Sequence, residues 1–319
     1  MVEGQRPVLA VLGPTASGKS ALGLALAERH GGEVINCDST AVYRGFDIGT
    51  DKPPVEARGG IPHHLIDIAD PTDVYTAAQF ARDAARVIRE IHARGNLPIL
   101  IGGTGFYYRA LTRGLFPGPG ADEGLRRRLN RVADRRGVER LHVMLHRTDP
   151  ESALRIMRRD RKRIVRALEV YFATGRTLTD HFSDTVSLIA DCEMVPFALR
   201  LPAALTAERV ARRVDEQFAR GIVEEVKALL ARGVPRDARP FGGLVYRQVM
   251  EMLGGVRDEA ATRALITQEN RRYARRQLIW FRKEPTLIWF DGPGERSETL
   301  TRVEGALAAR GLRPRGDDL

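Results

Sequence analysis

The stretch VLAVLGPTASGKS, residues 8–20, decides the class of fold. Its first five residues are apolar and predict a buried strand. Residues 13–20 then match the pattern G-x-x-x-x-G-K-[ST] without a gap, and a helical pattern begins at Lys19. A phosphate-binding P-loop needs this order, with a strand before the loop and a helix after it. The sequence therefore predicts a P-loop.

Each part of this loop has a chemical reason. Gly13 and Gly18 let the backbone turn so that successive N–H groups point inward, and the start of the helix adds partial positive charge. Lys19 can reach an outer phosphate, and the Ser20 hydroxyl can bind Mg²⁺. The loop indicates a pyrophosphate or polyphosphate ligand without selecting ATP. The residues predicted to bind the diphosphate or nucleotide are Gly13, Pro14, Thr15, Ala16, Ser17, Gly18, Lys19 and Ser20.

Strand and helix patterns alternate after the loop. Residues 33–37 and 97–101 predict two further short strands, and residues 77–94 have apolar positions at helical spacing. This order predicts an α/β fold, a P-loop NTPase-like parallel sheet core with helices on both faces. The strand at 97–101 is followed by Gly102-Gly103-Thr104, so it lacks the acid with which nucleotide hydrolases hold Mg²⁺.

A change in composition marks an insertion into this core. A Pro-Gly breaker at residues 117–120 is followed by arginine-rich helical patterns, among them 149–159 and 160–174, with no convincing strand. We therefore predict an all-helical basic insertion, and a return to the core that includes a long basic helix at 259–282. The predicted parts are the first half of the core, the helical insertion and the completion of the core, at residues 1–116, 117–190 and 191–319.

One acidic residue follows a predicted strand close to the loop. Asp38 comes directly after residues 33–37, and the carboxyl ends of parallel strands meet along one crevice. A carboxylate beside a bound phosphate ester can act as a metal ligand or as a general base. The alternative is a structural one, in which Asp38 caps a turn together with Ser39.

Charge and composition narrow the class of protein. Among 319 residues, 51 are basic and 41 acidic, which gives a net charge of +10 and favours an anionic partner such as nucleic acid. Only Cys37 and Cys192 are cysteines, which excludes a disulfide framework and a cysteine zinc site. The absence of a run of about 18 apolar residues excludes a membrane-spanning helix. A cytoplasmic enzyme is the simplest class.

Six ordered motifs carry a resemblance to a known family. The chain resembles the bacterial tRNA dimethylallyltransferases, which are isopentenyl-transferases, over residues 7–290. The motifs are GPTASGKS at 13–20, DSTAVYRGFDIGTDKP at 38–53, PHHLIDI at 62–68, GGTGFYYRAL at 102–111, DPESALRIMRRDRKRIVRALEV at 149–170 and RRYARRQLIWFR at 271–282.

The resemblance implies a reaction. Family members move a dimethylallyl group from dimethylallyl diphosphate to the exocyclic amine of the adenosine just 3′ of a tRNA anticodon. It implies Mg²⁺ as the cofactor, the tRNA anticodon loop as the partner, no membrane and a monomeric cytoplasmic enzyme. No γ-phosphate is transferred, which accounts for the missing acid after residues 97–101.

The resemblance also implies roles for individual residues. Asp38 is expected to be the general base, Thr15 and Lys19 to contact the diphosphate, and Arg247 to supply an arginine for it. The residues that match the family's tRNA contacts are Asp38, Ser39, Thr40, Ala41, Thr104, Arg126, Lys162, Arg163, Ile164, Val165, Arg166, Arg272, Tyr273, Arg275, Arg276 and Gln277.

The sequence departs from the usual family pattern at a few positions. Thr40-Ala41 stand where the family usually has Arg-Gln or a similar pair. Val245 replaces a glycine, and Ile279 replaces a threonine.

Other functions use the same loop. One is an ATP-dependent small-molecule kinase, which the basic insertion disfavours. Another is prenylation of free adenine nucleotides, which needs no RNA-binding insertion. The last is a non-catalytic RNA-binding P-loop protein, which the retention of Lys19, Ser20 and Asp38 disfavours.

Overall fold

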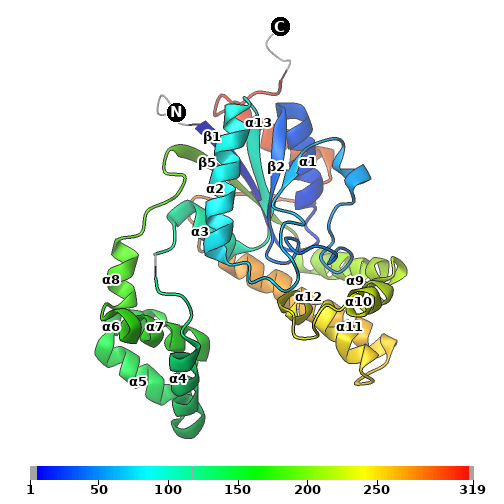
Figure 1. Cartoon of the computed structure of the whole chain (residues 1–319). Helices are drawn as coiled ribbons and strands as arrows, with labels where there is room; N and C mark the ends of the chain where they lie inside the picture. The colour runs from blue at the N-terminus through cyan, green and yellow to red at the C-terminus, as the bar shows by residue number, and fades with distance from the viewer. Residues whose placement is uncertain (1–5, 117, 316–319) are drawn as a thin grey trace. The chain divides into compact units, whose positions relative to one another are not determined.

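The P-loop strand lies inside a parallel sheet. In residues 6–116 and 118–315, which the computed structural model describes, six strands pair in parallel in the order β3-β2-β4-β1-β5-β6 (Figure 1). The register sets Leu12 opposite Gly102 on one side and opposite Ala198 on the other. The predicted parallel α/β sheet is confirmed. The strands are β1 Arg6–Leu12, β2 Gly32–Cys37, β3 His63–His64, β4 Leu97–Gly102, β5 Cys192–Arg200 and β6 Ile288–Asp291.

Helices cover both faces of this sheet, because successive side chains of a strand point to opposite faces. On one face, α1 (Lys19–His30) and α13 (Ser297–Ala308) pack in one apolar cluster with Leu9 and Val11 of β1. The helix α2 (Ala77–Ala93) contacts β2 and β4, and none of its buried residues belongs to that cluster, so it covers the other face. The remaining helical elements of the core are Val55–Arg58, α3 Gly105–Arg113, α9 Ala203–Ala219, α10 Ile222–Ala231, Arg239–Gly242, α11 Tyr246–Leu253 and α12 Glu259–Phe281.

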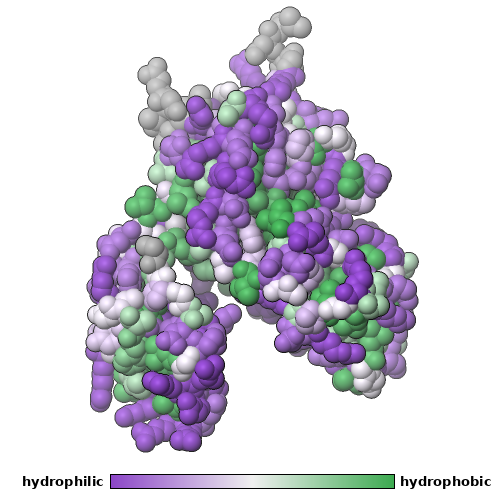
Figure 2. Space-filling model, in the orientation of Figure 1, coloured by the Kyte–Doolittle hydropathy of each residue, from purple (hydrophilic) through white to green (hydrophobic). Residues whose placement is uncertain are grey.

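The chain divides into two compact units. The core unit comprises Met1–Thr112 and Ile189–Leu319, and the helical unit comprises Arg113–Leu188. The helical unit holds α4 Glu123–Arg136, α5 Val138–Thr148, α6 Pro150–Arg155, α7 Arg161–Thr174 and α8 Leu178–Ser183 around an apolar core of its own. Hydrophilic residues line the outer edges of this unit in Figure 2. The predicted breaker begins at Pro117, which lies outside the described residues.

One helix of this unit is shorter than predicted. The pattern at 149–159 predicted a single helix, but α6 begins after its N-cap Asp149 and ends at Arg155. Ile156 is extended, and the Asp160 side chain accepts the Arg163 N–H to start α7. The Asp160 cap starts α7 at the predicted boundary, and the extended Ile156 ends α6 four residues before the predicted end. None of the helices in the described part of the chain is long and apolar enough to cross a membrane.

The departure at Val245 has a structural consequence. Its φ and ψ are 74° and −61°, a backbone conformation that favours glycine and is rare for a β-branched residue. The side chain is buried, and the residue caps the start of α11. This explains why the family pattern has glycine at the position, and it leaves this chain with local backbone strain at the entry to Tyr246 and Arg247.

A buried carboxylate joins the start of β2 to its neighbours. Glu33 is 3% exposed and accepts hydrogen bonds from Arg94 at 2.7 and 2.9 Å and from Asn96 at 2.8 Å. Its second oxygen lies 2.7 Å from His64 Nε2. The hydrogen bonds from Arg94 are the largest cause that lowers the pKa of Glu33 to about 2, against the effect of burial, and Asn96 and His64 lower it further.

We expect Glu33→Gln to destabilise the protein by about 2 kcal/mol at pH 7. Because the pKa of Glu33 is lower in the folded chain, its contribution is complete above about pH 4.5 and declines as the pH falls toward 2. Urea unfolding at pH 7, 5 and 3.5 measures this. The matched control is Glu90→Gln on the exposed pair with Arg86, expected to change stability by less than about 0.5 kcal/mol. A pH-independent difference for Glu33→Gln would contradict the ion-pair explanation.

Candidate functional site

The P-loop has the backbone conformation that its glycines predict. Gly13 and Gly18 have φ of 152° and 84°, and a Cβ at Gly18 would lie 2.0 Å from Glu295 Oε2. α1 begins without a side-chain cap, so its first N–H groups remain available to an anion. The Ser17 hydroxyl is buried and has no hydrogen-bond partner in the described part of the chain. A loop with unused buried donors fits a phosphate ligand.

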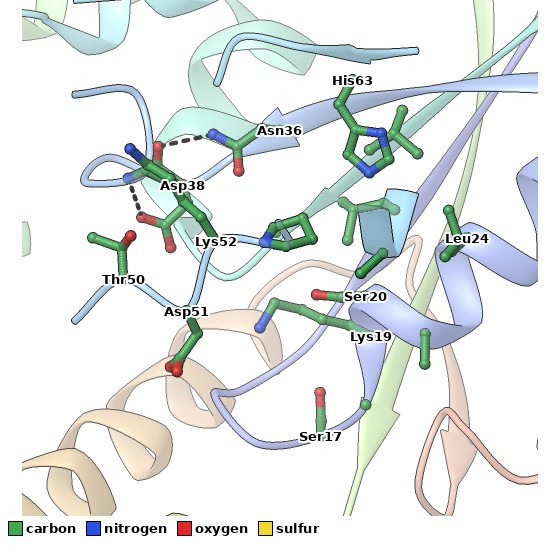
Figure 3. Close-up of a pocket in the computed structure, with 18 of the residues that line it drawn as sticks. Ser17, Lys19, Ser20, Leu24, Asn36, Asp38, Thr50, Asp51, Lys52 and His63 are labelled. Carbon is green, nitrogen blue, oxygen red and sulfur yellow. Dashed lines mark hydrogen bonds between the residues drawn. The ribbon is translucent and has the colours of Figure 1, made fainter. Parts of the chain in front are cut away.

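The loop opens into a cavity of about 480 Å³ (Figure 3). Charged and polar groups face it from the loop and from the ends of neighbouring strands, and apolar side chains line another part of its wall. Figure 3 shows Lys19 and Ser20 reaching in from α1, with Asp38 and Asp51 on the far side. The polar lining includes Ser17, Lys19, Ser20, Asn36, Asp38, Thr50, Asp51, Lys52, His63, Arg209, Arg213 and Glu295, and the apolar lining includes Leu24, Val34, Ile66 and Ile101.

Two cations meet at the loop. Lys19 is half-buried in the cavity wall, and desolvation followed by the charge of Arg213 lowers its pKa to about 8, while Asp38 and Asp51 raise it. Arg213, from α9, donates to Thr15 Oγ1 at 2.9 Å and pairs with Asp51 at 3.2 Å. Burial raises the pKa of Asp51, and Arg213 opposes that rise. This local positive charge suits an anionic ligand.

The arginine expected at the loop is not there. Arg247 lies on α11, is half exposed, pairs with Glu269 at 2.7 Å and does not line the cavity. Arg213 and Arg209 of α9 take the position instead, and Arg209 donates to Ala16 O at 2.7 Å. The only signal for this pair is their spacing of four residues, which places both on one helix face. Such spacing is common in an arginine-rich chain, so it does not single out these two residues.

Asp38 occupies the end of β2, as expected. Its Oδ1 accepts the N–H and hydroxyl of Thr40 at 2.8 and 2.7 Å and the Ala41 N–H at 3.3 Å. The capped turn that the sequence suggested as an alternative is therefore present at this oxygen. Oδ2 has no hydrogen-bond partner among the residues described, and Asp38 lines the cavity. The carboxylate is thus oriented through one oxygen and open at the other, which suits a general base.

A second group of predicted residues lies beside Asp38. The hydroxyl of Thr104, at the end of β4, accepts the Ser39 N–H at 3.2 Å. Burial, and next the charge of Asp38, raise the pKa of Tyr273, whose phenol also faces Thr104 and Gln277. The core unit therefore brings Asp38, Ser39, Thr104 and Tyr273 together. Ala41 is buried, whereas the other predicted contacts on α12, Arg272, Arg275 and Arg276, are exposed.

In the helical unit, some of the predicted RNA contacts are buried and others are exposed. Ile164 and Val165 are buried in the unit's apolar core, so their side chains do not reach an RNA. Arg126 and Arg166 pair with the buried carboxylate of Glu169 at 3.0 and 2.8 Å. Lys162 and Arg163 are exposed, and Arg163 pairs with Asp160 at 3.2 Å.

Comparison with known proteins identifies the family. A model of the IPP transferase family matches residues 41–284. The tRNA dimethylallyltransferase of Geobacter metallireducens is 44% identical over 95% of this chain and 98% of its own length. The chain belongs to the IPP transferase family. The crystal structure of the tRNA isopentenylpyrophosphate transferase from Bacillus halodurans is 35% identical, covers 96% of each chain and has a TM-score of 0.71.

The IPP transferase fold extends to more distant proteins. A eukaryotic dimethylallyltransferase acting on tRNA is 23% identical, with a TM-score of 0.78 over 98% of this chain and 82% of its own. This likeness concerns the fold.

An IPP transferase uses a prenyl diphosphate, whose charge is generally balanced by a divalent cation. In the described residues, no three His, Cys, Asp or Glu side chains are grouped so as to hold a metal ion. Ser20 nevertheless lines the cavity beside Lys19. A hard cation held by one protein oxygen, phosphate oxygens and water fits this donor set.

We expect Arg213→Ala to weaken the binding of inorganic diphosphate about 10- to 100-fold, because a charge-assisted bond to the anion is lost. Isothermal titration calorimetry measures the Kd. Arg212→Ala is the matched control, since the neighbouring side chain on α9 points to Glu216. Arg247→Ala tests the expectation from the sequence. If this variant weakened diphosphate binding 10- to 100-fold and Arg213→Ala did not, Arg247 would be the arginine that binds the diphosphate.

Proposed function

We propose that this chain transfers the dimethylallyl group of dimethylallyl diphosphate to the exocyclic amine of the adenosine just 3′ of the anticodon in tRNA, releasing diphosphate. The observation that carries the proposal is a phosphate cradle and an open carboxylate oxygen of Asp38 facing the same cavity. Relatives of similar length named tRNA dimethylallyltransferase support it.

The reaction is a displacement at an allylic carbon. The amine nitrogen forms a bond to the first carbon of the dimethylallyl group, and the bond from that carbon to the diphosphate oxygen breaks with its electron pair. The proton of the amine goes to Asp38 Oδ2. Because the lone pair of an adenine amine is delocalised into the ring, removing this proton as the new bond forms assists the attack.

The leaving diphosphate gains negative charge in the transition state. The amides of the P-loop, Lys19 and Arg213 are placed to stabilise that charge without rearrangement. Mg²⁺ at the Ser20 hydroxyl would supply further charge neutralisation on the diphosphate. Leu24, Val34, Ile66 and Ile101 in the cavity wall offer apolar contacts for the hydrocarbon part of the donor.

The helical unit supports an RNA acceptor. Residues 113–188 contain 17 basic and 10 acidic residues, a net charge of +7 out of the +10 of the whole chain. Neutralising RNA phosphates is the ordinary use of such an excess. The exposed Lys162 and Arg163 and the arginines of α12 are proposed as contacts. The adenosine would leave its stack to reach Asp38, which is least costly in a loop. Because the proposed acceptor is tRNA, we propose that the enzyme acts in the cytoplasm, as a monomer.

The other functions have less support. β4 ends at Gly102 and is followed by Gly103-Thr104, without the acid that a kinase uses for its metal. Free adenine nucleotides carry too few phosphates to use a separate unit of net charge +7.

The direct test is a transfer assay. The protein is incubated with Mg²⁺, radiolabelled dimethylallyl diphosphate and either unmodified tRNA or AMP, and the label in each acceptor is counted. We expect label in tRNA alone. Label in AMP would favour the nucleotide acceptor, and no label in either would contradict prenyl transfer.

The role of Asp38 is tested by Asp38→Asn. The amide oxygen can still accept the Thr40 bonds, so the turn is kept, while the proton acceptor is lost. We expect kcat to fall by about 10²- to 10⁴-fold, with the Kd values for tRNA and inorganic diphosphate changed less than about threefold. Asp70→Asn, at an exposed carboxylate, is the control. Near-normal turnover of Asp38→Asn would exclude the general-base role.

A further inference from the structure

The side chain of Gln277 is buried and bridges the P-loop and the turn after β4. It projects from α12, and the residue is 6% exposed. Its Oε1 accepts the N–H of Thr15 in the P-loop at 2.8 Å, and its Nε2 donates to Gly103 O at 2.9 Å. One side-chain amide therefore joins three elements that are far apart in the sequence.

The turn after β4 is shaped to admit this amide. A Cβ at Gly103 would lie 2.3 Å from Gln277 Nε2, closer than real contacts allow. The second glycine of the GGTG motif therefore leaves room for the Gln277 side chain. This contact gives a reason for that glycine that does not depend on any ligand.

Each end of the bridge is next to residues with a role in the proposed reaction. Thr15 accepts a hydrogen bond from Arg213, which belongs to the diphosphate side. Gly103 precedes Thr104, whose hydroxyl accepts the N–H of Ser39, directly after Asp38. Gln277 thus links the cradle of the leaving group to the turn that carries the proton acceptor.

We propose that Gln277 is a positioning residue that sets the distance between the diphosphate cradle and the Asp38 turn, rather than an RNA contact. This inference rests on the proposed transfer reaction. Displacement requires the reacting atoms to approach within about 3–3.5 Å, and a misplacement of about 1 Å can lower the rate about 100-fold. A bridge of two hydrogen bonds from one buried side chain controls such a distance without touching either substrate.

The first test replaces the amide with a side chain of similar length that makes neither bond, Gln277→Met. We expect kcat to fall 10- to 100-fold, with the KM and Kd for tRNA changed less than threefold. Gln268→Met, at an exposed position of the same helix, is the matched control and should retain wild-type values. Arg276→Ala, next to Gln277 and exposed, should show the opposite split, with its larger effect on the KM for tRNA.

A second variant approaches the same contact from the other side. Gly103→Ala keeps Gln277 and every RNA-facing side chain but pushes a methyl group against the amide. We expect the same fall in kcat and an unchanged Kd for tRNA. Thermal unfolding of each variant shows whether it is folded at the assay temperature.

The outcomes separate the two proposals. Wild-type protein that transfers label, together with a Gln277→Met variant of normal kcat, would overturn the inference alone. A tenfold or larger rise in the KM for tRNA with kcat retained would make Gln277 an RNA contact and would also overturn it. A wild-type protein that transfers nothing would overturn the proposed function and this inference together.

Discussion

The site depends on the close parallel pairing of β2, β4 and β1, which end side by side at one edge of the sheet. A Cβ at Gly102 would lie 2.0 Å from Cys37 O, so only glycine lets β4 approach β2 at its last residue. Because of that approach, the P-loop after β1 and Asp38 after β2 line one cavity, and Thr104 after β4 accepts the N–H of Ser39 beside Asp38. Because the three strands end next to one another, short loops are enough to bring these residues together.

Several charged side chains of the cavity wall form ion pairs. Lys52 is buried and pairs with Asp47 and Asp67, and Arg209 pairs with Glu295. These pairs fix the walls of the cavity and contribute little net charge to it. Lys19 and Arg213 share the cavity with two carboxylates, Asp38 and Asp51, and Arg213 pairs with Asp51. The cavity therefore presents cations at the P-loop and the carboxylate of Asp38 in the same lining.

The helical unit distributes its charge differently. Part of its arginine is used internally, since Arg126 and Arg166 share the buried carboxylate of Glu169. Arg126 of α4 links that helix to Glu169 of α7, and Arg166 of α7 pairs with the same carboxylate, which would lose its compensation only if both arginines were removed. The unit as a whole has a net charge of +7, and other basic residues, Lys162 and Arg163 among them, are exposed. Such a surface binds a polyanion through many weak contacts, which suits the backbone of a folded RNA.

The sequence alone determined the features that depend on local pattern. The P-loop, the parallel α/β core, the position of Asp38 at a strand end and the basic helical insertion all follow from short-range spacing, glycine placement and charge. The family resemblance added the reaction. These predictions succeed because a strand, a loop and a helix that are adjacent in the chain restrict one another's geometry.

Only the tertiary structure decided which distant side chains complete the site. Arg213 lies at the loop whereas Arg247 pairs with Glu269 away from it, Gln277 is buried, and Ile164 and Val165 belong to a core. Thr15 and Gln277 are 262 residues apart, and no local pattern encodes such a contact. Burial and long-range packing determine which of many similar arginines and glutamines lie at the site. These residues can therefore be identified only from the folded structure.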